Sequence, residues 1–377
     1  MALSKNLKKA MASLQKTFDS EMVGVASEAA NREIVSYTTG SLMLDMALGG
    51  GSRAGFPEGR MIELYGPESS GKTTTALIAM AARQQLEAER AEADPKYQEK
   101  MCVFVDAEHA LDMRLAEEYG VDLQKLIYIN PETAEDAMDA LDLFIRTGEI
   151  GMAIVDSVAA LVPAAMEESS YQQQFMALNA RFMSGVCQRM TGPLYKHGTT
   201  LVFINQIREQ VGKWSPTGVA ETTPGGRALK YYSTIRMSVR RGESLKGEDG
   251  ELAGHTMKYR IVKNKIYTPF KEAAVNLVYG VGIDKVDEVF QMALKAGYIQ
   301  QGGAWFTYVD EETGEIREID GVQIRSQGRA KMIEMIHEIP MLYGELEDKI
   351  RGVDKIDMDD MSEEEIEAHK AANKDQE

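Results

Sequence analysis

Cysteine is scarce in this chain, which has Cys102 and Cys187 among its 377 residues. Two thiols far apart in the sequence form neither a disulfide framework nor the closely spaced ligand pairs of a metal site. The sequence therefore excludes a disulfide-rich secreted scaffold and favours a reducing compartment.

Long apolar runs are also missing. No stretch reaches the roughly 18 apolar residues that a membrane-spanning helix needs. The first residues place lysines between isolated apolar side chains, without the continuous apolar segment and cleavage site of a secretory leader. We therefore expect a cytoplasmic protein with no membrane partner.

Positive charge is deficient as well. Lysine and arginine total 42 against 59 acidic residues, so the net charge is 42 − 59 = −17. A nucleic-acid partner favours a basic face, and the net charge alone argues against one. Residues 345–377 contain 13 acidic and 5 basic side chains, or −8, which leaves −9 for the rest of the chain. Local basic positions must therefore decide whether nucleic acid binds.

A regular alternation of apolar strands and helical segments is present. Helical periodicity predicts helices over 74–90, 133–146 and 176–190, the second with a capping pair at Thr133 and Asp136. The alternation predicts an α/β fold with a doubly wound, mostly parallel sheet, whose strand ends share one edge. The predicted strands all end at a polar or glycine residue: Met61–Tyr65 before Gly66, Cys102–Val105 before Asp106, Met152–Val155 before Asp156, and Leu201–Ile204 before Asn205 and Gln206.

Four segments are expected along the chain. Residues 1–35 contain an amphipathic helix over 3–18, which packs either on its own domain or on a neighbouring subunit. Residues 36–279 are expected to form the core domain and residues 280–344 a smaller α/β domain. Residues 345–377 form an acidic tail.

The sharpest motif is the phosphate-loop pattern G-x-x-x-x-G-K-[ST], which residues 66–73 match as Gly-Pro-Glu-Ser-Ser-Gly-Lys-Thr. A predicted strand precedes it and a predicted helix follows. Its glycines allow turns that aim N–H groups at phosphate oxygens, and the helix adds the positive end of its dipole. Lys72 is expected to neutralise the β- and γ-phosphates, and Thr73 to hold Mg²⁺. The motif therefore predicts an ATP–Mg²⁺ site.

Three polar residues at or just beyond other strand ends complete the expected site. Asp156 is expected to support the Mg²⁺ shell. Glu108 is expected to position the water that attacks the γ-phosphate, although an ordinary surface glutamate explains its spacing equally well. Gln206 is expected to reach the γ-phosphate and to report the nucleotide state to the segment that follows it.

Taken together, the segments around these residues resemble the bacterial RecA recombinase family over roughly residues 36–310. A generic phosphate-loop ATPase shares the first segment and the one around Asp156, whereas the full ordered set is specific. Beyond residues 66–73, the segments are Asp-Ala-Glu-His-Ala-Leu-Asp (106–112), Val-Asp-Ser-Val-Ala-Ala-Leu (155–161), Phe-Ile-Asn-Gln-Ile-Arg (203–208), Glu-Thr-Thr-Pro-Gly-Gly (221–226) and Val-Lys-Asn-Lys (262–265).

The resemblance implies a function in homologous recombination. It implies a helical filament on single-stranded DNA that pairs with homologous duplex DNA, exchanges strands and hydrolyses ATP when DNA is bound. It also raises SOS repressors and the single-strand-binding protein as partners. The nucleotide contacts that it implies are Gly66, Pro67, Glu68, Ser69, Ser70, Gly71, Lys72, Thr73, Thr74, Asp112 and Asp156, with Thr73 and Asp156 at the metal.

The resemblance also assigns catalytic roles. Lys72, Glu108 and Gln206 act on the nucleotide of their own subunit, and Lys263 and Lys265 reach the ATP of the next. Lys263 and Lys265 lie two residues apart on a predicted strand and therefore share one face. Such a pair stabilises transition-state charge, and a solvated lysine face is the plain alternative.

Two segments, at about 164–176 and 207–226, are expected to form mobile DNA-binding loops. From the sequence alone, they also fit ordinary surface connections. Glycine N–H groups can hold phosphates, and an apolar side chain can wedge between bases. The DNA contacts that the resemblance implies are Met176, Arg181, Ser184, Arg208, Gly225, Gly226 and Arg227.

One departure from the family pattern concerns the nucleotide base, because Leu115 stands where the family usually stacks a tyrosine on adenine. The resemblance further implies that the acidic tail restrains access to duplex DNA. Three rival functions remain open from the residues alone: a ring helicase of related fold, a small-molecule kinase with a phosphate loop, and a DNA-coating protein that binds ATP without hydrolysing it.

Overall fold

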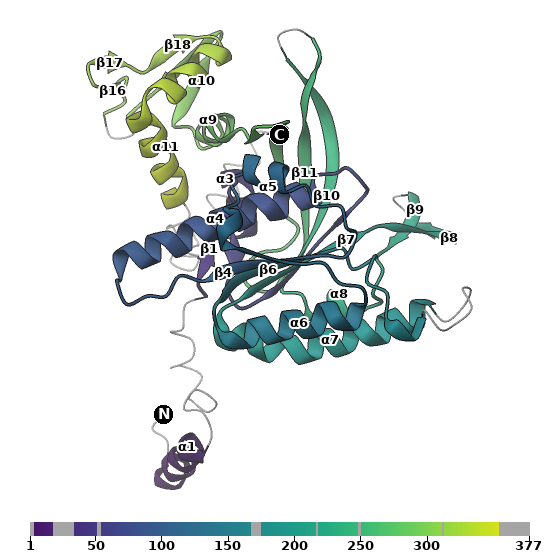
Figure 1. Ribbon diagram of the computed structural model, residues 1–377. Helices are drawn as coiled ribbons and strands as arrows, with labels where there is room; N and C mark the ends of the chain where they lie inside the picture. Colours follow the sequence, from purple (N-terminus) through teal and green to yellow (C-terminus); the bar gives the residue numbers. More distant parts are fainter. Residues whose placement is uncertain are drawn as a thin grey trace. The chain divides into compact units, whose positions relative to one another are not determined.

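A computed structural model describes residues 4–17, 34–50, 54–166, 175–215, 218–247, 250–310 and 313–353. Its largest element is a nine-stranded sheet with strand order β13-β12-β11-β10-β3-β7-β6-β4-β5 (Figure 1). The six strands from β10 to β5 are parallel, and β11, β12 and β13 extend the sheet antiparallel. This confirms the predicted α/β class. The bounds are β3 Met61–Gly66, β4 Met101–Asp106, β5 Leu126–Ile129, β6 Ile150–Asp156, β7 Thr200–Gln206, β10 Ile235–Lys246, β11 Leu252–Asn264, β12 Glu272–Val278 and β13 Gly282–Ile283.

Helices cover both faces of this sheet. Helix α4 (Lys72–Ala93) packs on one face, and α6 (Ala134–Thr147) and α7 (Phe175–His197) pack on the other (Figure 1). A parallel strand covered on both faces must be apolar along its whole length. Strand β6 shows this, because each of its residues is buried.

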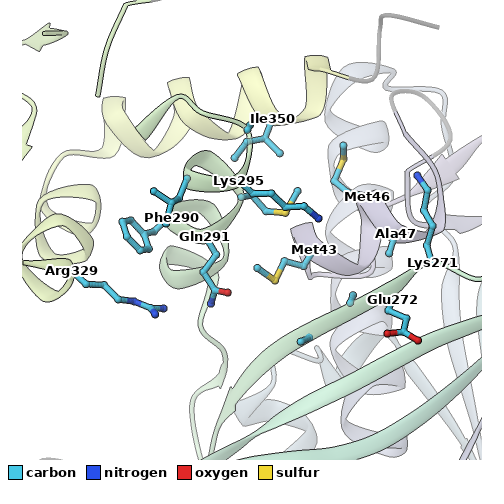
Figure 2. A pocket seen from close by; sticks show the side chains of 15 residues that line it. Met43, Met46, Ala47, Lys271, Glu272, Phe290, Gln291, Lys295, Arg329 and Ile350 are labelled. Carbon is cyan, nitrogen blue, oxygen red and sulfur yellow. The ribbon is translucent and has the colours of Figure 1, made fainter. Parts of the chain in front are cut away.

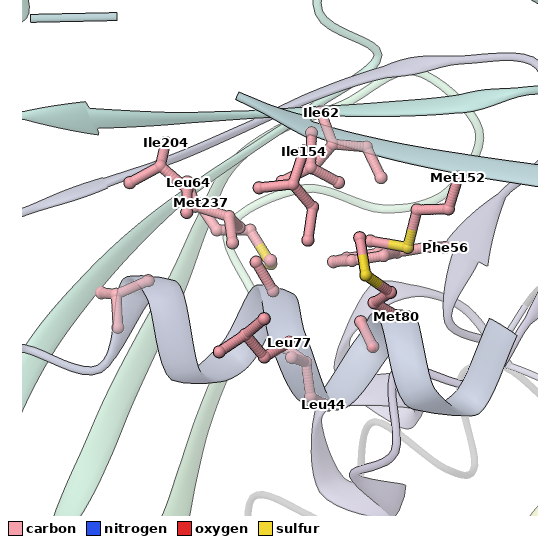
Figure 3. Close-up of a cluster of buried hydrophobic side chains, with 14 of the residues drawn as sticks. Leu44, Phe56, Ile62, Leu64, Leu77, Met80, Met152, Ile154, Ile204 and Met237 are labelled. Atoms are coloured by element: carbon pink, nitrogen blue, oxygen red, sulfur yellow. The ribbon is translucent and has the colours of Figure 1, made fainter. Parts of the chain in front are cut away.

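The core on the α4 face is built from aliphatic side chains of the central strands. Leu77 and Met80 of α4 lie against Ile62, Leu64 and Ile154 (Figure 3). All five are at most 1% exposed. Burial of each such side chain contributes about 1.5–3 kcal/mol, so this contact holds α4, and with it the phosphate loop, on the sheet.

The strand ends meet as the sequence predicts. In the register of the sheet, Gly66 pairs with Gln206 and Asp106 pairs with Asp156. Because these strands are parallel, their carboxyl ends lie along one edge, where ligands bind in such sheets.

The three predicted helices are confirmed, and two of them are longer than predicted. Helix α6 begins after Thr133, whose side chain accepts a hydrogen bond from the Asp136 N–H at 3.1 Å. It ends at Gly148 in the left-handed conformation, φ 81°. The remaining short elements near the sheet are β1 Ser36–Tyr37, α3 Leu42–Leu48, β2 Phe56–Pro57, α5 Met113–Glu118, the 3₁₀ turns Leu123–Lys125 and Ala164–Met166, and α8 Ala228–Tyr232.

The segment predicted as a loop over 207–226 is a hairpin. Strand β8 (Arg208–Ser215) pairs antiparallel with β9 (Gly218–Thr222), and Arg208 lies opposite Thr222. The prediction was wrong because glycine and proline dominated the composition, whereas strand pairing satisfies the backbone groups of this segment. The first predicted loop, at 164–176, lies mostly outside the described residues.

A second cluster of elements follows β13. Helices α9 (Lys285–Lys295), α10 (Arg329–Glu338) and α11 (Pro340–Val353) enclose their own apolar core. Helix α11 continues through Val353, nine residues beyond the expected boundary at 344. The strands of this cluster are β14 Ile299–Gly302, β15 Trp305–Tyr308 and β18 Arg325–Gln327 in one sheet, and β16 Glu318–Ile319 and β17 Val322–Gln323 in another.

Residues 1–35 form a unit separate from residues 36–377. In its described part, this unit contains α1 (Lys5–Thr17), which matches the predicted amphipathic helix. None of the described helices has the length and apolar character of a membrane span.

Candidate nucleotide and DNA site

The phosphate loop connects the end of β3 to the start of α4. Gly71, at the N-cap of α4, has φ 91° and ψ 19°, a left-handed conformation that glycine adopts without strain. A Cβ at this position would lie 2.4 Å from the Met257 sulfur. Packing and backbone conformation therefore both require glycine, and the loop closes onto the positive end of a 22-residue helix.

Lys72 is the first residue of α4, and its side chain folds back over the loop. Its ammonium donates a hydrogen bond to the Pro67 carbonyl at 2.6 Å, and the Ser70 hydroxyl donates to the same oxygen at 2.8 Å. Burial lowers the pKa of Lys72, although the carboxylates of Asp156 and Glu108 oppose that shift. A buried cation held by a neutral carbonyl gains strongly from exchanging that contact for phosphate oxygens.

Thr73 and Asp156 meet across the site. The Thr73 hydroxyl donates to Asp156 Oδ2 at 2.6 Å. Burial at the end of β6, aided by the nearby Glu108 carboxylate, raises the pKa of Asp156 to about 6, although the Thr73 hydrogen bond and Lys72 oppose the shift.

A hydroxyl and one carboxylate fit Mg²⁺ bound together with nucleotide phosphates. Mg²⁺ usually takes one or two carboxylates and completes its shell with phosphate oxygens and water. Within the described ranges, no three His, Cys, Asp or Glu residues gather into a group that could hold a metal ion. The residues present therefore suit a metal–nucleotide complex better than a metal bound by protein alone.

Glu108 lies at the centre of the edge, just beyond β4. Its Oε1 accepts hydrogen bonds from the Ser157 hydroxyl and, at 3.0 Å, from Gln206 Nε2. The backbone N–H groups of Ala107 and Glu108 donate to the Asp156 carbonyl at 2.8 and 3.3 Å. The structure thus brings Glu108, Asp156 and Gln206 together, as the sequence predicts.

Asp112 lies at the far end of the Asp106–Asp112 segment, directly before α5. Its carboxylate caps α5 by accepting hydrogen bonds from the Arg114 and Leu115 N–H groups at 2.9 and 3.4 Å. Leu115 is 38% exposed beside it. Burial raises the pKa of Tyr119, and the neighbouring Thr74 side chain, one residue beyond the phosphate motif, opposes that shift. These residues extend the site from the loop toward α5.

Two neighbours of the loop had no role in the sequence analysis. His255 is 4% exposed, its Nδ1 lies 3.1 Å from the Tyr279 hydroxyl, and its Nε2 would lie 4.0 Å from a Cβ on Gly71. The Tyr279 ring is 42% exposed. Neither residue belongs to a motif, and only the folding of β11 and β12 beside the loop identifies them.

Lys263 and Lys265 lie side by side, as predicted from their spacing. Both ammonium groups donate to the Tyr231 carbonyl at 3.0 Å, and Lys263 also donates to the Lys230 carbonyl at 2.6 Å. Burial lowers the pKa of Lys263 to about 8, and the charges of Lys265 and Arg236 add to the shift. The two lysines thus hold the C-terminal end of α8.

The predicted DNA residues of α7 lie beside a glycine pair. Arg181 and Ser184 are exposed on α7, three residues apart and thus on one face. Gly226 has φ 71°, and a Cβ on it would lie 2.6 Å from Ala180 Cβ. Close packing of the Gly225–Gly226 turn on α7 thus brings residues distant in sequence to one surface.

The other predicted DNA residues lie close in sequence to this turn or to α7. Arg208 is exposed at the start of β8, two residues after Gln206, and Arg227 is exposed at the N-cap of α8. Met176 belongs to the first turn of α7, and the position of its side chain lies outside the described structure.

Two further residues, Ser157 and Glu63, link the two parts of the edge and had no role in the sequence analysis. The Ser157 hydroxyl donates to Glu108. The buried carboxylate of Glu63 accepts hydrogen bonds from Arg236 and, at 3.0 Å, from Asn205, whose amide also donates to the Pro224 carbonyl at 3.1 Å. Pro224 directly precedes the glycine pair. A glutamate inside the apolar run of β3 was the available signal for Glu63, because an acid is rarely buried without partners.

The fold and this edge together define a phosphate-loop ATPase of the α/β class. The family model described as the RecA N-terminal domain matches residues 5–284. Curated relatives named Protein RecA include those of Ruminococcus albus (40% identical; 92% of this chain, 80% of the relative), Halalkalibacterium halodurans (39%; 95% of each) and Mycobacteroides abscessus (43%; 83% and 86%). The chain therefore belongs to the RecA family, whose members are DNA-dependent ATPases of homologous recombination.

Proposed function

We propose that the Gly66–Gly71 loop, Lys72 and Thr74 bind the phosphates of ATP, while Thr73 and Asp156 hold its Mg²⁺. Magnesium supplies charge neutralisation at the phosphates when it is bound. The buried Lys72 ammonium and the Thr73–Asp156 contact support this assignment. The loop residues Pro67, Glu68, Ser69 and Ser70 complete the nucleotide contacts, with Asp112 on the α5 side.

Glu108 acts on water in this proposal. It orients a water molecule toward the γ-phosphorus and takes its proton as the new P–O bond forms and the bond to the β-phosphate oxygen breaks. Lys263 and Lys265 of the next subunit in a filament stabilise the developing negative charge. Their parallel placement at the end of α8 supports a joint role.

The surface formed by α7, the Gly225–Gly226 turn and the start of β8 binds single-stranded DNA and then a homologous duplex. Arg181, Arg208 and Arg227 neutralise phosphates, and the backbone of the glycine pair approaches the strand closely. Local cations explain how a chain of net charge −17 binds DNA. Met176 and Ser184 complete the proposed contacts.

One observation carries the proposed coupling between ATP and DNA: the 3.0 Å hydrogen bond from Gln206 to Glu108. Gln206 ends β7 and lies two residues before Arg208 at the start of the β8–β9 hairpin. A γ-phosphate that competes for the Gln206 amide frees the Glu108 carboxylate for water. The same exchange changes the position of the start of the hairpin, so the conformation of the DNA surface depends on which nucleotide is bound.

ATP hydrolysis with and without single-stranded DNA tests this function. We expect DNA to stimulate phosphate release several-fold, and Lys72→Ala to lower the stimulated rate about a hundredfold or more because it removes a buried phosphate-binding cation. Lys100→Ala is the matched control, because Lys100 is a partly buried lysine whose ammonium, like that of Lys72, donates to a carbonyl, at 2.7 Å and away from this edge.

The alternative outcomes separate the rival functions. Hydrolysis that is indifferent to DNA supports a small-molecule kinase, and ATP binding without turnover supports a passive DNA-coating protein. Closed rings in electron micrographs support a helicase, whereas open helical filaments support the recombinase. A cytoplasmic location, SOS repressor cleavage and cooperation with a single-strand-binding protein are further proposals drawn from the family.

A further inference from the structure

A groove lies between the ATPase core and the C-terminal helices, away from the nucleotide edge. It has a volume of about 960 Å³ and is bounded by α3, the first residues of β12, α9 and the end of α11 (Figure 2). No residue of the proposed nucleotide or DNA site lines it. The groove is therefore available for another role.

The groove has an apolar floor that suits a flexible partner. Met43 and Met46 of α3 face Phe290 of α9 and Ile350 of α11 across it (Figure 2). Methionine side chains are unbranched and polarisable, so they adapt to differently shaped apolar groups. The floor thus fits a chain that carries aliphatic or methionine side chains.

The rim of the groove is basic. Lys271, Lys295 and Arg329 line it, against one carboxylate, Glu272. Arg329 is ion-paired with Asp287, and the Lys271 ammonium lies 4.5 Å from the Tyr267 ring centroid. Within the described part of the chain, no ion pair involves Lys295, whose side chain extends from α9 toward α3 (Figure 2). The rim therefore favours an acidic partner.

An open strand edge adds backbone groups to the groove. In the described structure, β13 pairs with β12 only at Leu277 and Val278, so residues 272–274 have no strand partner on the edge opposite β11. These three residues line the groove. An extended chain laid along such an edge gains main-chain hydrogen bonds while alternate side chains enter the groove.

The sequence supplies a segment with these properties directly after α11. Ile350 lines the groove and α11 ends at Val353, so the chain leaves a helix that borders the groove. Residues 354–377 contain 10 acidic and 3 basic side chains, a net charge of −7. Ile356 and Met358 alternate with Asp357 and Asp359, which in an extended chain places apolar groups on one face and carboxylates on the other.

We propose that residues 354–361 bind in this groove of their own chain, with Ile356 and Met358 on the methionine floor and the intervening aspartates beside Lys295 and Lys271. The segment needs no linker, because it continues the helix that lines the groove. A tethered segment has an effective concentration in the millimolar range, so even weak contacts hold it in place.

Cysteine cross-linking in the full chain tests this docking. The two native thiols are buried, and burial raises the pKa of each to about 12, so they react slowly with maleimides. Ala296→Cys places a thiol at an exposed position of the groove, and Asp357→Cys places one in the tail. Lys285→Cys, at the opposite end of α9, is the matched control partner for Asp357→Cys.

At about 0.1 M salt, we expect a short bismaleimide to close the Ala296→Cys/Asp357→Cys pair within one chain roughly tenfold faster than the control pair. Adding Lys295→Glu, or raising the salt to about 1 M, should remove most of this advantage, because both weaken the ionic contacts. Lys331 is an exposed lysine of α10 that does not line the groove, so Lys331→Glu should leave the faster cross-linking of this pair unchanged.

Equal rates for the two pairs would overturn the proposal. Cross-linked dimers in place of closed monomers would also overturn it, because the groove would then hold the tail of a second copy. Circular dichroism of each variant distinguishes lost docking from lost folding. The result depends on neither ATP nor DNA, so it is independent of the proposed ATPase function.

Discussion

At the scale of single residues, Asp156 is the side chain whose ionisation limits the proposed metal site. Its pKa is raised to about 6, chiefly by burial, and Mg²⁺ binds the ionised carboxylate. Above pH 7 the group is charged and affinity is full. Affinity is lost as the pH falls through 6, and at pH 5 only about a tenth of the molecules carry the charge.

We therefore expect Mg²⁺-dependent ATP binding to weaken about tenfold between pH 7.5 and pH 5, measured by calorimetric titration with the nucleotide and excess Mg²⁺. Asp156→Asn should bind weakly at every pH and lose this dependence, because its amide does not titrate. The same pH slope in Asp156→Asn would show that a different group controls metal binding.

Prediction from sequence succeeded best for the positions of residues that belong to a local motif. The phosphate loop and the polar strand ends needed only a spacing pattern and the rule that parallel strands end at one edge. Glu63, Ser157 and His255 could not be found in this way. Ser157 and its partner Glu108 are 49 residues apart in the sequence, and Glu63 and its partner Arg236 are 173 residues apart. His255 is on β11, and its partner Tyr279 follows the neighbouring strand β12. Only the order of the strands in the sheet brings these residues together.

At the scale of elements, the Gly225–Gly226 turn packs the proposed DNA surface against α7. Gly226 is in the left-handed region, and its Cα lies so close to Ala180 that a Cβ has no room. We expect Gly226→Ala to destabilise the turn by more than the 1–2 kcal/mol or so of left-handed strain alone. Single-stranded DNA affinity, measured by fluorescence anisotropy, should fall about tenfold.

Gly321→Ala is the matched control for this substitution. Gly321 has φ 79°, and a Cβ there would meet no atom within 4 Å. This variant therefore carries backbone strain without a steric clash, and its DNA affinity should be unchanged. If both variants bind DNA as the parent does, the turn has no part in the DNA surface.

Helices and strands were predictable where burial of one face makes apolar residues recur at a regular spacing, and less predictable where that spacing is interrupted. The central strands and α4, α6 and α7 appeared because apolar residues recur with strand or helix periodicity. The β8–β9 hairpin was missed because its glycines and proline interrupt the alternation that marks a strand. The register between β8 and β9 is itself irregular, with a shift between Glu209 and Trp214.

At the scale of the whole molecule, the end of α11 sets how far the C-terminus can be truncated without loss of the C-terminal core. Leu346 is fully buried and Ile350 is 2% exposed in the C-terminal core, and Glu345 accepts hydrogen bonds from Tyr308 and Arg317 at 2.7 and 3.1 Å. A cut at 344, the boundary expected from charge, removes these contacts. Loss of each buried aliphatic side chain costs about 2–5 kcal/mol.

We therefore expect a chain that ends at Gly344 to lose the cooperative unfolding of its C-terminal core in calorimetry, whereas a chain that ends at Val353 keeps it.

The chain that ends at Val353 lacks residues 354–377, which carry a charge of −7, so its net charge is −17 + 7 = −10. Less repulsion from DNA phosphates should then strengthen duplex binding at low salt, and the gain should shrink as salt screens the charges. A gain that persists at about 1 M salt would instead mean that the tail blocks the duplex sterically, since screening leaves steric exclusion unchanged.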